Sequence, residues 1–408
     1  MNKRNSPTAG LHLNIITAGL CVLGFGARAA SESEQQKLAS VNAGFAFKLL
    51  KEISKEQPGS NIFISPYSVS AALQMVCNGA GGQTRLEMQQ VLGTARLASE
   101  LVNSVNRDFD KSLNGRGTNI ILNAANALWC QKGTLIKPEF ISCNQQFFGA
   151  TVGTLDFGDP GAVGVINALA SEKTHGRITH IADGLINELT ELLLANAVCF
   201  KGSWEEPFKV QDTKERPFHL RRGRQKTLPM MEQSRKFTYR RGTGYQAARL
   251  PYQGGSLGMY VFLPDPGSSP EKLLGIMTGN IWERVTQPGF SERPGTLVLP
   301  RFRLENGVEM KRPLMALGMK SAFGNADLSG ISDRDLFISA VRQCAFVEVN
   351  EEGTEAAAVT MVDIASAIEM KPPKPFQMIV DRPFLFLITD EQTGIILFMG
   401  IVFDPGLS

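Results

Sequence analysis

The chain has 408 residues, of which 43% are hydrophobic and 20% charged, and its formal net charge is +3. A charge this close to neutral gives no reason to expect a nucleic-acid partner. Length alone suggests two or three domains, but no linker, repeat or low-complexity run divides the chain.

The N-terminus has the three parts of a secretory signal peptide. Lys3 and Arg4 precede a largely apolar run at 11–25, and Ala27-Arg28-Ala29 fits an A-x-A cleavage site. The alternatives are a short buried helix or a membrane anchor, but the run is short for a bilayer span and no later segment is long and apolar enough. We expect residues 1–29 to be removed and the mature protein to be extracellular, or periplasmic in a bacterium with two membranes.

The cysteines and the lack of a glycosylation signal bear on the thiols and the source of the mature chain. Five cysteines remain after residue 29, and none lies in a C-x-x-C pair, which favours buried free thiols over a disulfide framework. The chain has no N-x-[ST] sequon. A secretory signal without a sequon indicates a bacterial source.

Hydrophobic periodicity predicts several elements in the first half of the chain. We expect helices over 35–53 and 65–75, buried strands over 119–128 and 192–200, and a surface helix over 165–175. The glycines at 79, 81 and 82 follow the second helix. Because the P-loop lysine is missing, we interpret them as a helix end instead of a phosphate cradle.

A basic region lies at 221–241, with Arg221, Arg222, Arg224, Lys226, Arg235, Lys236, Arg240 and Arg241. It allows two interpretations: a polyanion site, or the solvated face of hairpins. The second is favoured, because Glu232 is interspersed and the chain as a whole is near neutral.

The sharpest enzyme motif is Gly254-Gly-Ser-Leu-Gly258, which matches the G-x-S-x-G nucleophile elbow. That elbow needs a helix after the serine, whereas a strand over 259–263 follows here, so we predict a hairpin turn. The triad also lacks a histidine after the serine, since the last one is His219. We expect no enzyme activity, no cofactor and no metal at His175 and His180.

A segment near the C-terminus has no proline and, after Gly353, no glycine for many residues. After the strand pattern at 346–349, one parity from 354 onwards reads Thr, Ala, Ala, Thr, Val, Ile, and the acidic residues Glu355 and Asp363 share the other. A strand puts alternate side chains on opposite faces. The segment can therefore bury a row of small and apolar side chains in a sheet.

The segment 349–358, Val-Asn-Glu-Glu-Gly-Thr-Glu-Ala-Ala-Ala, resembles the hinge of the serpins, and 380–386 resembles the stretch after their reactive loop. Blocks at 61–68, 196–208, 250–252, 299–302 and 326–330 agree with that family in order. The resemblance implies one α+β serpin domain over 30–408, with three β-sheets, about nine helices, a metastable native state and an exposed reactive-centre loop at about 353–375.

The resemblance also implies the positions that control this loop. The hinge is expected at Glu351, Glu352, Gly353, Thr354, Glu355, Ala356, Ala357 and Ala358. The buried polar cluster called the shutter is expected at Ser65, Ser68, Asn196 and Gln343, and the breach, where the loop enters the sheet, at Trp204. Gln343 stands where serpins commonly carry histidine, and glutamine cannot become charged near neutral pH.

The function implied is suicide inhibition of a serine protease by a monomer. The protease attacks the loop, forms an acyl-enzyme and is trapped when the loop inserts into the main sheet. Counting from the hinge glycine puts the reactive bond at Ala367 and Ile368, and the small Ser366 and Ala367 suit an elastase-like pocket. Cleavage after Met370 or Lys371 stays open, as do a non-inhibitory serpin that binds or carries a ligand and an inhibitor of papain-like cysteine proteases.

Overall fold

The computed structural model describes residues 31–114, 120–277, 289–354 and 374–406. The predicted signal peptide at 1–29 lies outside the described residues. So do Glu355, Ala356, Ala357 and Ala358 of the predicted hinge and the predicted reactive bond Ala367–Ile368.

Eight α-helices and two β-sheets make up this part of the chain. The helices are α1 (Glu32–Glu56), α2 (Pro66–Cys77), α3 (Gly82–Leu92), α4 (Ser99–Asn114), α5 (Pro138–Phe148), α6 (Gly161–Lys173), α7 (Pro270–Ile276) and α9 (Lys311–Leu317). The strands are β1 (Ile62–Ile64), β2 (Ile120–Gln131), β3 (Thr151–Leu155), β4 (Leu192–Ser203), β5 (Lys214–His219), β6 (Gln225–Gly242), β7 (Tyr245–Pro251), β8 (Leu257–Pro264), β9 (Ser291–Pro300), β10 (Phe302–Glu309), β11 (Ile338–Val349), β12 (Gly353–Thr354), β13 (Phe376–Ile379), β14 (Phe384–Asp390) and β15 (Ile396–Val402).

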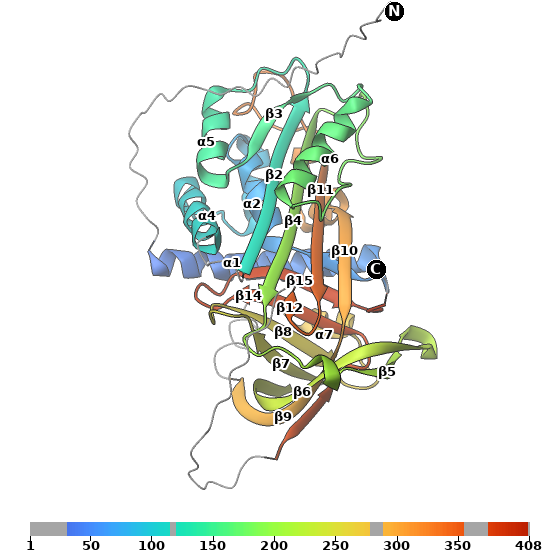
Figure 1. Cartoon of the computed structure of the whole chain (residues 1–408). Helices are drawn as coiled ribbons and strands as arrows, with labels where there is room; N and C mark the ends of the chain where they lie inside the picture. Colours follow the sequence, from blue (N-terminus) through green and yellow to red (C-terminus); the bar gives the residue numbers. More distant parts are fainter. Residues whose placement is uncertain (1–30, 115–119, 278–288, 355–373, 407–408) are drawn as a thin grey trace, which may run out of the picture.

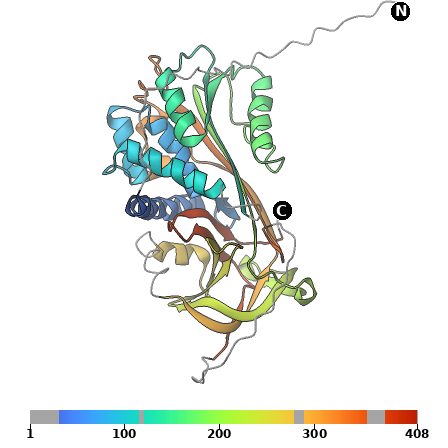
Figure 2. The same cartoon turned by 60° about the vertical axis from the view of Figure 1, so that its left-hand side comes forward.

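A six-stranded sheet of long strands forms one half of the molecule (Figure 1). Its order is β10-β11-β4-β2-β3, with the short β12 added to β4, and β4 and β11 at its centre pair in parallel. Parallel strands are usually buried on both faces. That holds here: α6 crosses one face, while α2, α4 and α5 cover the other (Figure 2).

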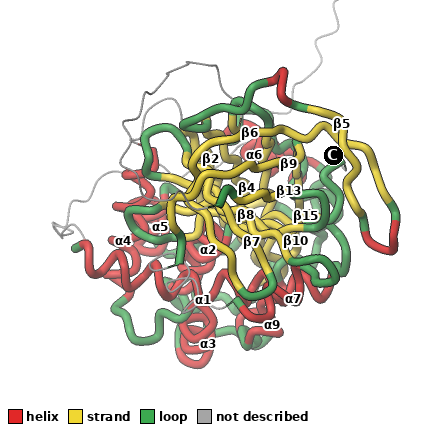
Figure 3. The backbone as a smooth tube through the Cα atoms, turned by 90° about the horizontal axis from the view of Figure 1, so that it is seen from below, coloured by secondary structure: helices red, strands yellow, loops and turns green. Residues whose placement is uncertain are grey.

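A nine-stranded sheet forms the other half, in the order β1-β15-β14-β8-β7-β6-β9-β13, with β5 added to β6. The 18-residue β6 pairs with β5 over 225–230, with β9 over 230–239 and with β7 over 238–242. This one curved strand joins what the family resemblance counts as two sheets, so the described residues form two hydrogen-bonded sheets instead of three. Seen from below, the β5–β6 hairpin projects at one edge (Figure 3).

The predicted elements appear near their expected positions. The helices over 35–53, 65–75 and 165–175 are found as α1, α2 and α6, and the two buried strands are β2 and β4. The glycine cluster follows α2, as expected, and it also precedes a helix, because Gly81 is the N-cap of α3 and Gly82 is its first residue. None of the helices described is long and apolar enough to cross a membrane.

The core between the two sheets is built on aromatic side chains from strands far apart in sequence. Phe63 of β1 is fully buried and stacks on Phe386 of β14 at 5.8 Å and on Phe398 of β15 at 5.3 Å between ring centroids. The three-residue strand β1 is thereby held to two other strands of the nine-stranded sheet by aromatic packing.

Replacing Phe63 with alanine should lower the free energy of unfolding by about 3 to 5 kcal/mol, because the change leaves a cavity between two stacked rings. Denaturant unfolding followed by fluorescence measures this. The control is Leu86→Ala on the exposed face of α3, which should change stability by less than about 0.5 kcal/mol. Equal losses for the two variants would contradict the assigned packing.

Candidate functional site

The start of the predicted reactive loop is already a strand of the six-stranded sheet. β4 and β11 pair with each other up to Cys199 and Phe346. Beyond that point β12 pairs with β4, antiparallel, with Gly353 opposite Ser203. The central strands are thus parted at this end, and the loop begins in the opening.

Position 353 requires glycine for two reasons, its backbone conformation and the close approach of β4. Its φ is +135°, and a Cβ at this position would lie 2.3 Å from the carbonyl oxygen of Gly202. Any L side chain would push the loop away from β4. The glycine therefore allows the close approach with which strand pairing starts.

A buried ion pair anchors the chain just before this glycine. Glu351 accepts hydrogen bonds from Arg301 Nε at 2.8 Å and Arg301 Nη2 at 2.5 Å, and a third from the Thr213 hydroxyl. Burial raises the pKa of the Glu351 carboxyl, but the hydrogen bonds from Arg301 and Thr213 outweigh burial and lower the pKa overall. The side chain is therefore a charged anchor, whereas Glu352 is exposed.

Trp204 closes the same end of the sheet. Its indole Nε1 donates to the carbonyl oxygen of Asn350 at 3.0 Å, and its backbone N–H donates to that of Glu352 at 3.0 Å. Its ring stacks on Tyr252 at 4.6 Å. The predicted breach residue thus contacts the turn that leads into the loop.

The four predicted shutter residues lie together beneath the middle of β4 and β11. Gln343 donates from Nε2 to Asn196 Oδ1 at 2.6 Å and to the Ser65 carbonyl oxygen at 3.0 Å, and accepts from the Ser65 N–H at 2.8 Å. Asn196 donates to Ser68 Oγ at 2.6 Å. All four residues are less than 5% exposed, so their hydrogen bonds are shielded from water. In such surroundings an unpaired polar group raises the free energy of the folded state.

Sequence reasoning missed one further member of this cluster. Asn126 of β2 accepts a hydrogen bond from Asn196 Nδ2 at 2.7 Å, and it extends the cluster to a third strand. In the sequence Asn126 is one polar position in a strand pattern, which does not distinguish it from other polar residues of that strand. The pairing of β2 with β4 shows that it lies opposite Asn196.

The remaining candidates have structural explanations. Ser256 lies in the turn between β7 and β8, as predicted. No group of three His, Cys, Asp or Glu suited to a metal occurs among the residues described. The five cysteines after residue 29 are free, and all but Cys143 are buried.

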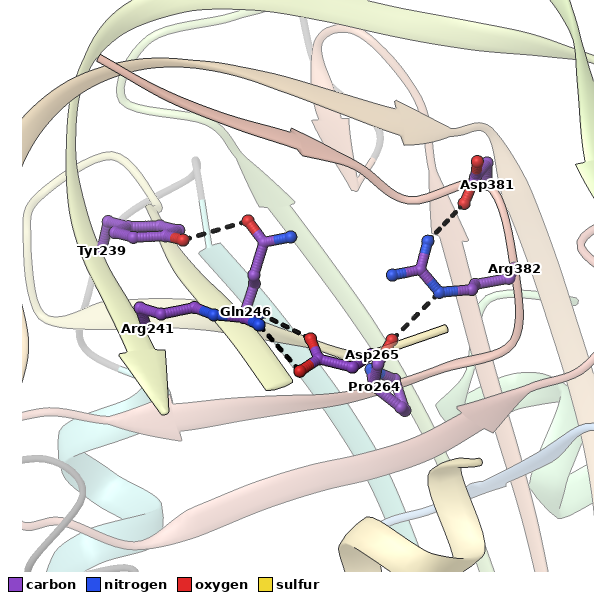
Figure 4. Close-up of polar contacts among 7 residues, drawn as sticks. All are labelled: Tyr239, Arg241, Gln246, Pro264, Asp265, Asp381 and Arg382. Carbon is purple, nitrogen blue, oxygen red and sulfur yellow. Dashed lines mark hydrogen bonds and ion pairs between the residues drawn. The ribbon is translucent and has the colours of Figure 1, made fainter. Parts of the chain in front are cut away.

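Much of the basic region is neutralised by ion pairs. Arg241 binds Asp265 through two hydrogen bonds of 2.5 and 2.7 Å (Figure 4). Arg221 pairs with Glu271, and Arg235 with Glu206. These contacts agree with a solvated hairpin face and leave less charge for a polyanion.

Comparison with known proteins assigns the family. Residues 40–405 match the family model described as Serpin (serine protease inhibitor). The chain is 38% identical to a leukocyte elastase inhibitor of Sus scrofa, in a match that covers 91% of this chain and all of that protein. It is 35% identical to an uncharacterized serpin-like protein of Thermococcus kodakarensis, covering 92% of this chain and 87% of the relative.

A solved structure agrees with the fold as a whole. The mouse protein-Z dependent protease inhibitor superposes with a TM-score of 0.82 at 27% identity, covering 92% of this chain and all of that one. The α+β fold in a single domain is thereby confirmed. The chain belongs to the serpin family of serine protease inhibitors.

Proposed function

We propose that this serpin traps an elastase-like serine protease on the bond between Ala367 and Ile368. Small side chains at Ser366 and Ala367 fit a shallow, uncharged pocket. The name of the Sus scrofa relative, leukocyte elastase inhibitor, supports the same class of target. The protein itself is consumed as an inhibitor and turns over no substrate.

The covalent step is the first half of proteolysis. The protease serine Oγ attacks the carbonyl carbon of Ala367, the bond to the Ile368 nitrogen breaks, and the serine proton passes to the leaving amine. The product is an ester that water would normally hydrolyse. Trapping requires the loop to move before that hydrolysis.

The observation that carries the proposal is the register of β12 on β4. Gly353 and Thr354 already pair with Ser203 and Gly202, antiparallel, so each further loop residue would pair one position further back along β4. Fourteen residues on, Ala367 comes opposite Leu189, just beyond the first residue of β4. Full insertion therefore uses the whole length of the sheet, on the order of 45 Å.

The same register matches side-chain chemistry. Ala356 and Ala358 would lie opposite Phe200 and Val198, which pack in the core between the sheets. Thr360 would lie opposite Asn196, the polar position on that face of β4. When β4 and β11 separate, the hydrogen bond between Asn196 and Gln343 would break, and the Thr360 hydroxyl would take a place in the shutter cluster.

The energetic direction also favours insertion. An inserted loop exchanges one parallel ladder, β4 with β11, for two antiparallel ladders, which are slightly more stable per residue. It also buries the small and apolar row of the loop. The uncleaved protein is then kinetically stable, and the barrier to opening β4 from β11 sets its lifetime.

Three alternatives make different predictions. Cleavage after Met370 or Lys371 would place the protease past the end of β4 by several residues. A non-inhibitory serpin would be cleaved without trapping, and an inhibitor of papain-like enzymes would form a thioester with cysteine proteases. Polyanion binding, a separate question from these three, is disfavoured by the ion pairs that the basic region makes.

We also propose that residues 1–29 are an export signal and that the mature protein is extracellular, or periplasmic in a bacterium with two membranes. The family match starts at residue 40, and the match to the Sus scrofa relative covers all of that protein but 91% of this chain. The relatives thus give no support for secretion, and the proposal depends on the pattern at 3–29. A bacterial source likewise stays a prediction, since the Sus scrofa and Thermococcus kodakarensis relatives come from a mammal and an archaeon.

The mature protein mixed with an elastase-like serine protease should give a complex that survives a denaturing gel, with the new C-terminus at Ala367 by mass spectrometry. The matched control is Ala358→Pro, which keeps the reactive bond but removes a ladder hydrogen bond during insertion. It should be cleaved without trapping. Cleavage of the unaltered protein with no complex and no rise in melting temperature would leave the non-inhibitory serpin.

Replacing Ala367 with arginine should redirect trapping from elastase-like to trypsin-like proteases, whose specificity pocket holds an aspartate. The association rate with trypsin should rise by at least about a hundredfold, roughly 2.7 kcal/mol. Lys371→Ala is the control and should leave elastase trapping unchanged. If Lys371→Ala abolishes trapping instead, the reactive bond follows residue 371.

When the full chain is expressed in a secreting host, the protein recovered from the culture medium should begin at Ala30, because Ala27-Arg28-Ala29 is the predicted cleavage site. N-terminal sequencing and mass spectrometry measure this. The control is a chain that lacks residues 1–29, which should stay in the cytoplasm. An intact N-terminus on protein that remains in the cytoplasm would refute the export signal.

A further inference from the structure

Three carboxamide side chains meet in the layer of helices that covers one face of the six-stranded sheet (Figure 2). Gln74 lies in α2, Asn78 follows the last residue of the same helix, and Asn103 lies in α4. Asn78 Oδ1 accepts one hydrogen bond from Gln74 Nε2 and another from Asn103 Nδ2, each at 3.2 Å. We call these three residues the amide junction. Asn103 Nδ2 also lies 3.8 Å from Cys143 Sγ, so the junction reaches α5.

Each of the three amides leaves one atom unpaired. Among the residues that the structure describes, Gln74 Oε1, Asn103 Oδ1 and Asn78 Nδ2 have no hydrogen-bond partner, although all three atoms are shielded from solvent. Gln74 is 2% exposed and Asn103 is 5% exposed. Most buried polar atoms in folded proteins do have a partner, so three unpaired atoms in one cluster need an explanation.

Turning the amides over does not pair these atoms. If one or two of the three amides were turned by 180°, two donors or two acceptors would face each other at a contact. Turning all three together keeps both hydrogen bonds, now with Asn78 as the donor, and again leaves one atom of each amide unpaired. The junction therefore lacks partners for three atoms in either arrangement.

The unpaired atoms lie close together. The oxygen and nitrogen of one amide group are about 2.3 Å apart, given bond lengths of about 1.23 and 1.33 Å. Because the amides touch at 3.2 Å, the unpaired oxygens of Gln74 and Asn103 lie within roughly 5.5 Å of Asn78 Oδ1. Hydrogen bonds of about 2.9 Å on two sides of one small molecule span such a separation.

The chemistry of the unpaired atoms selects the occupant. Two of them are acceptors and one is a donor. A cation would be repelled by the hydrogens of the donor, and an anion by the two acceptor oxygens. Water donates two hydrogen bonds and also accepts, and buried waters typically make about three bonds to groups that are otherwise unpaired.

We propose that the amide junction is a binding site for one internal water molecule, which donates to Gln74 Oε1 and Asn103 Oδ1 and accepts from Asn78 Nδ2. The water completes the hydrogen bonds that join α2 to α4. This inference is independent of the bond that a protease cleaves, because every group in it belongs to the helices.

The site also has a positioning role, because α2 is held by a buried polar cluster at each end. Ser65 of the shutter is the N-cap of α2, and Ser68 lies in its first turn. The amide junction lies at the C-terminal end of the same helix. Fixing this end prevents α2 from shifting along its axis, which holds the two shutter serines in place beneath β4 and β11.

A crystal structure that resolves ordered water tests the site directly. We expect density for one water within about 2.7 to 3.2 Å of all three unpaired atoms. Three ordered amides with no density between them, or amides paired with other groups, would overturn the proposal. This measurement uses the unaltered protein and so does not depend on how well any variant folds.

The variant Gln74→Met separates a hydrated junction from a dry one by the sign of its effect. Methionine is unbranched like glutamine but has neither the amide donor nor the acceptor. In a hydrated junction the change removes bonds to both Asn78 and the water, so the melting temperature should fall by at least about 2 °C. In a dry junction it removes an unpaired oxygen, and an unchanged or higher melting temperature would contradict the bound water.

The matched control is Gln83→Met on the exposed face of α3, where the amide donates to Glu87 at the surface. It should shift the melting temperature by less than about 1 °C. Hydrogen exchange tests the positioning role: the backbone N–H groups at 65–68 should exchange at least about threefold faster in Gln74→Met than in the control. Equal exchange in the two variants would overturn the connection between the junction and the shutter.

Discussion

The parallel pairing of β4 with β11 is the interaction on which the rest of this structure depends. It closes the six-stranded sheet from Leu192 to Cys199, and both covering layers pack on the two strands at once. Ile166 and Ala170 of α6 lie in one cluster with Ala197 and Phe346. Parallel pairs are slightly less stable per residue than antiparallel ones, which favours separation of the sheet between these two strands.

The polar cluster beneath this ladder gives the closed sheet its specificity. Gln343 and Asn196 join β11 to β4 through one buried hydrogen bond, and Ser65 and Ser68 connect both strands to the start of α2. Separating the strands leaves buried groups unpaired unless an incoming residue replaces them, which costs about 1 to 3 kcal/mol for each group. Since glutamine does not titrate, this cost stays the same between pH 5 and 8, where a histidine would change charge.

The two ends of the parting strands differ in chemistry. At the β12 end, Glu351, Arg301 and Trp204 fix the chain so that strand addition has a defined register. The opposite end has ion pairs between exposed side chains. The fixed chain at the β12 end and the solvent-exposed side chains at the opposite end suit a reactive loop that inserts between β4 and β11 from the β12 end only. The charged region at 221–241 lies in the nine-stranded sheet and its hairpin, where Arg221 pairs with Glu271 and Arg241 pairs with Asp265.

The sequence by itself determined the family, because several separated blocks of residues agree with that family in order. It also determined that the glycines at 254–258 form a turn, since a strand follows them. Only the tertiary structure decided that two sheets are joined through β6, that Asn126 completes the polar cluster, and that Arg301 pairs with Glu351. Strand curvature and contacts between residues about 50 to 150 positions apart depend on packing and register, which periodicity along the chain does not encode.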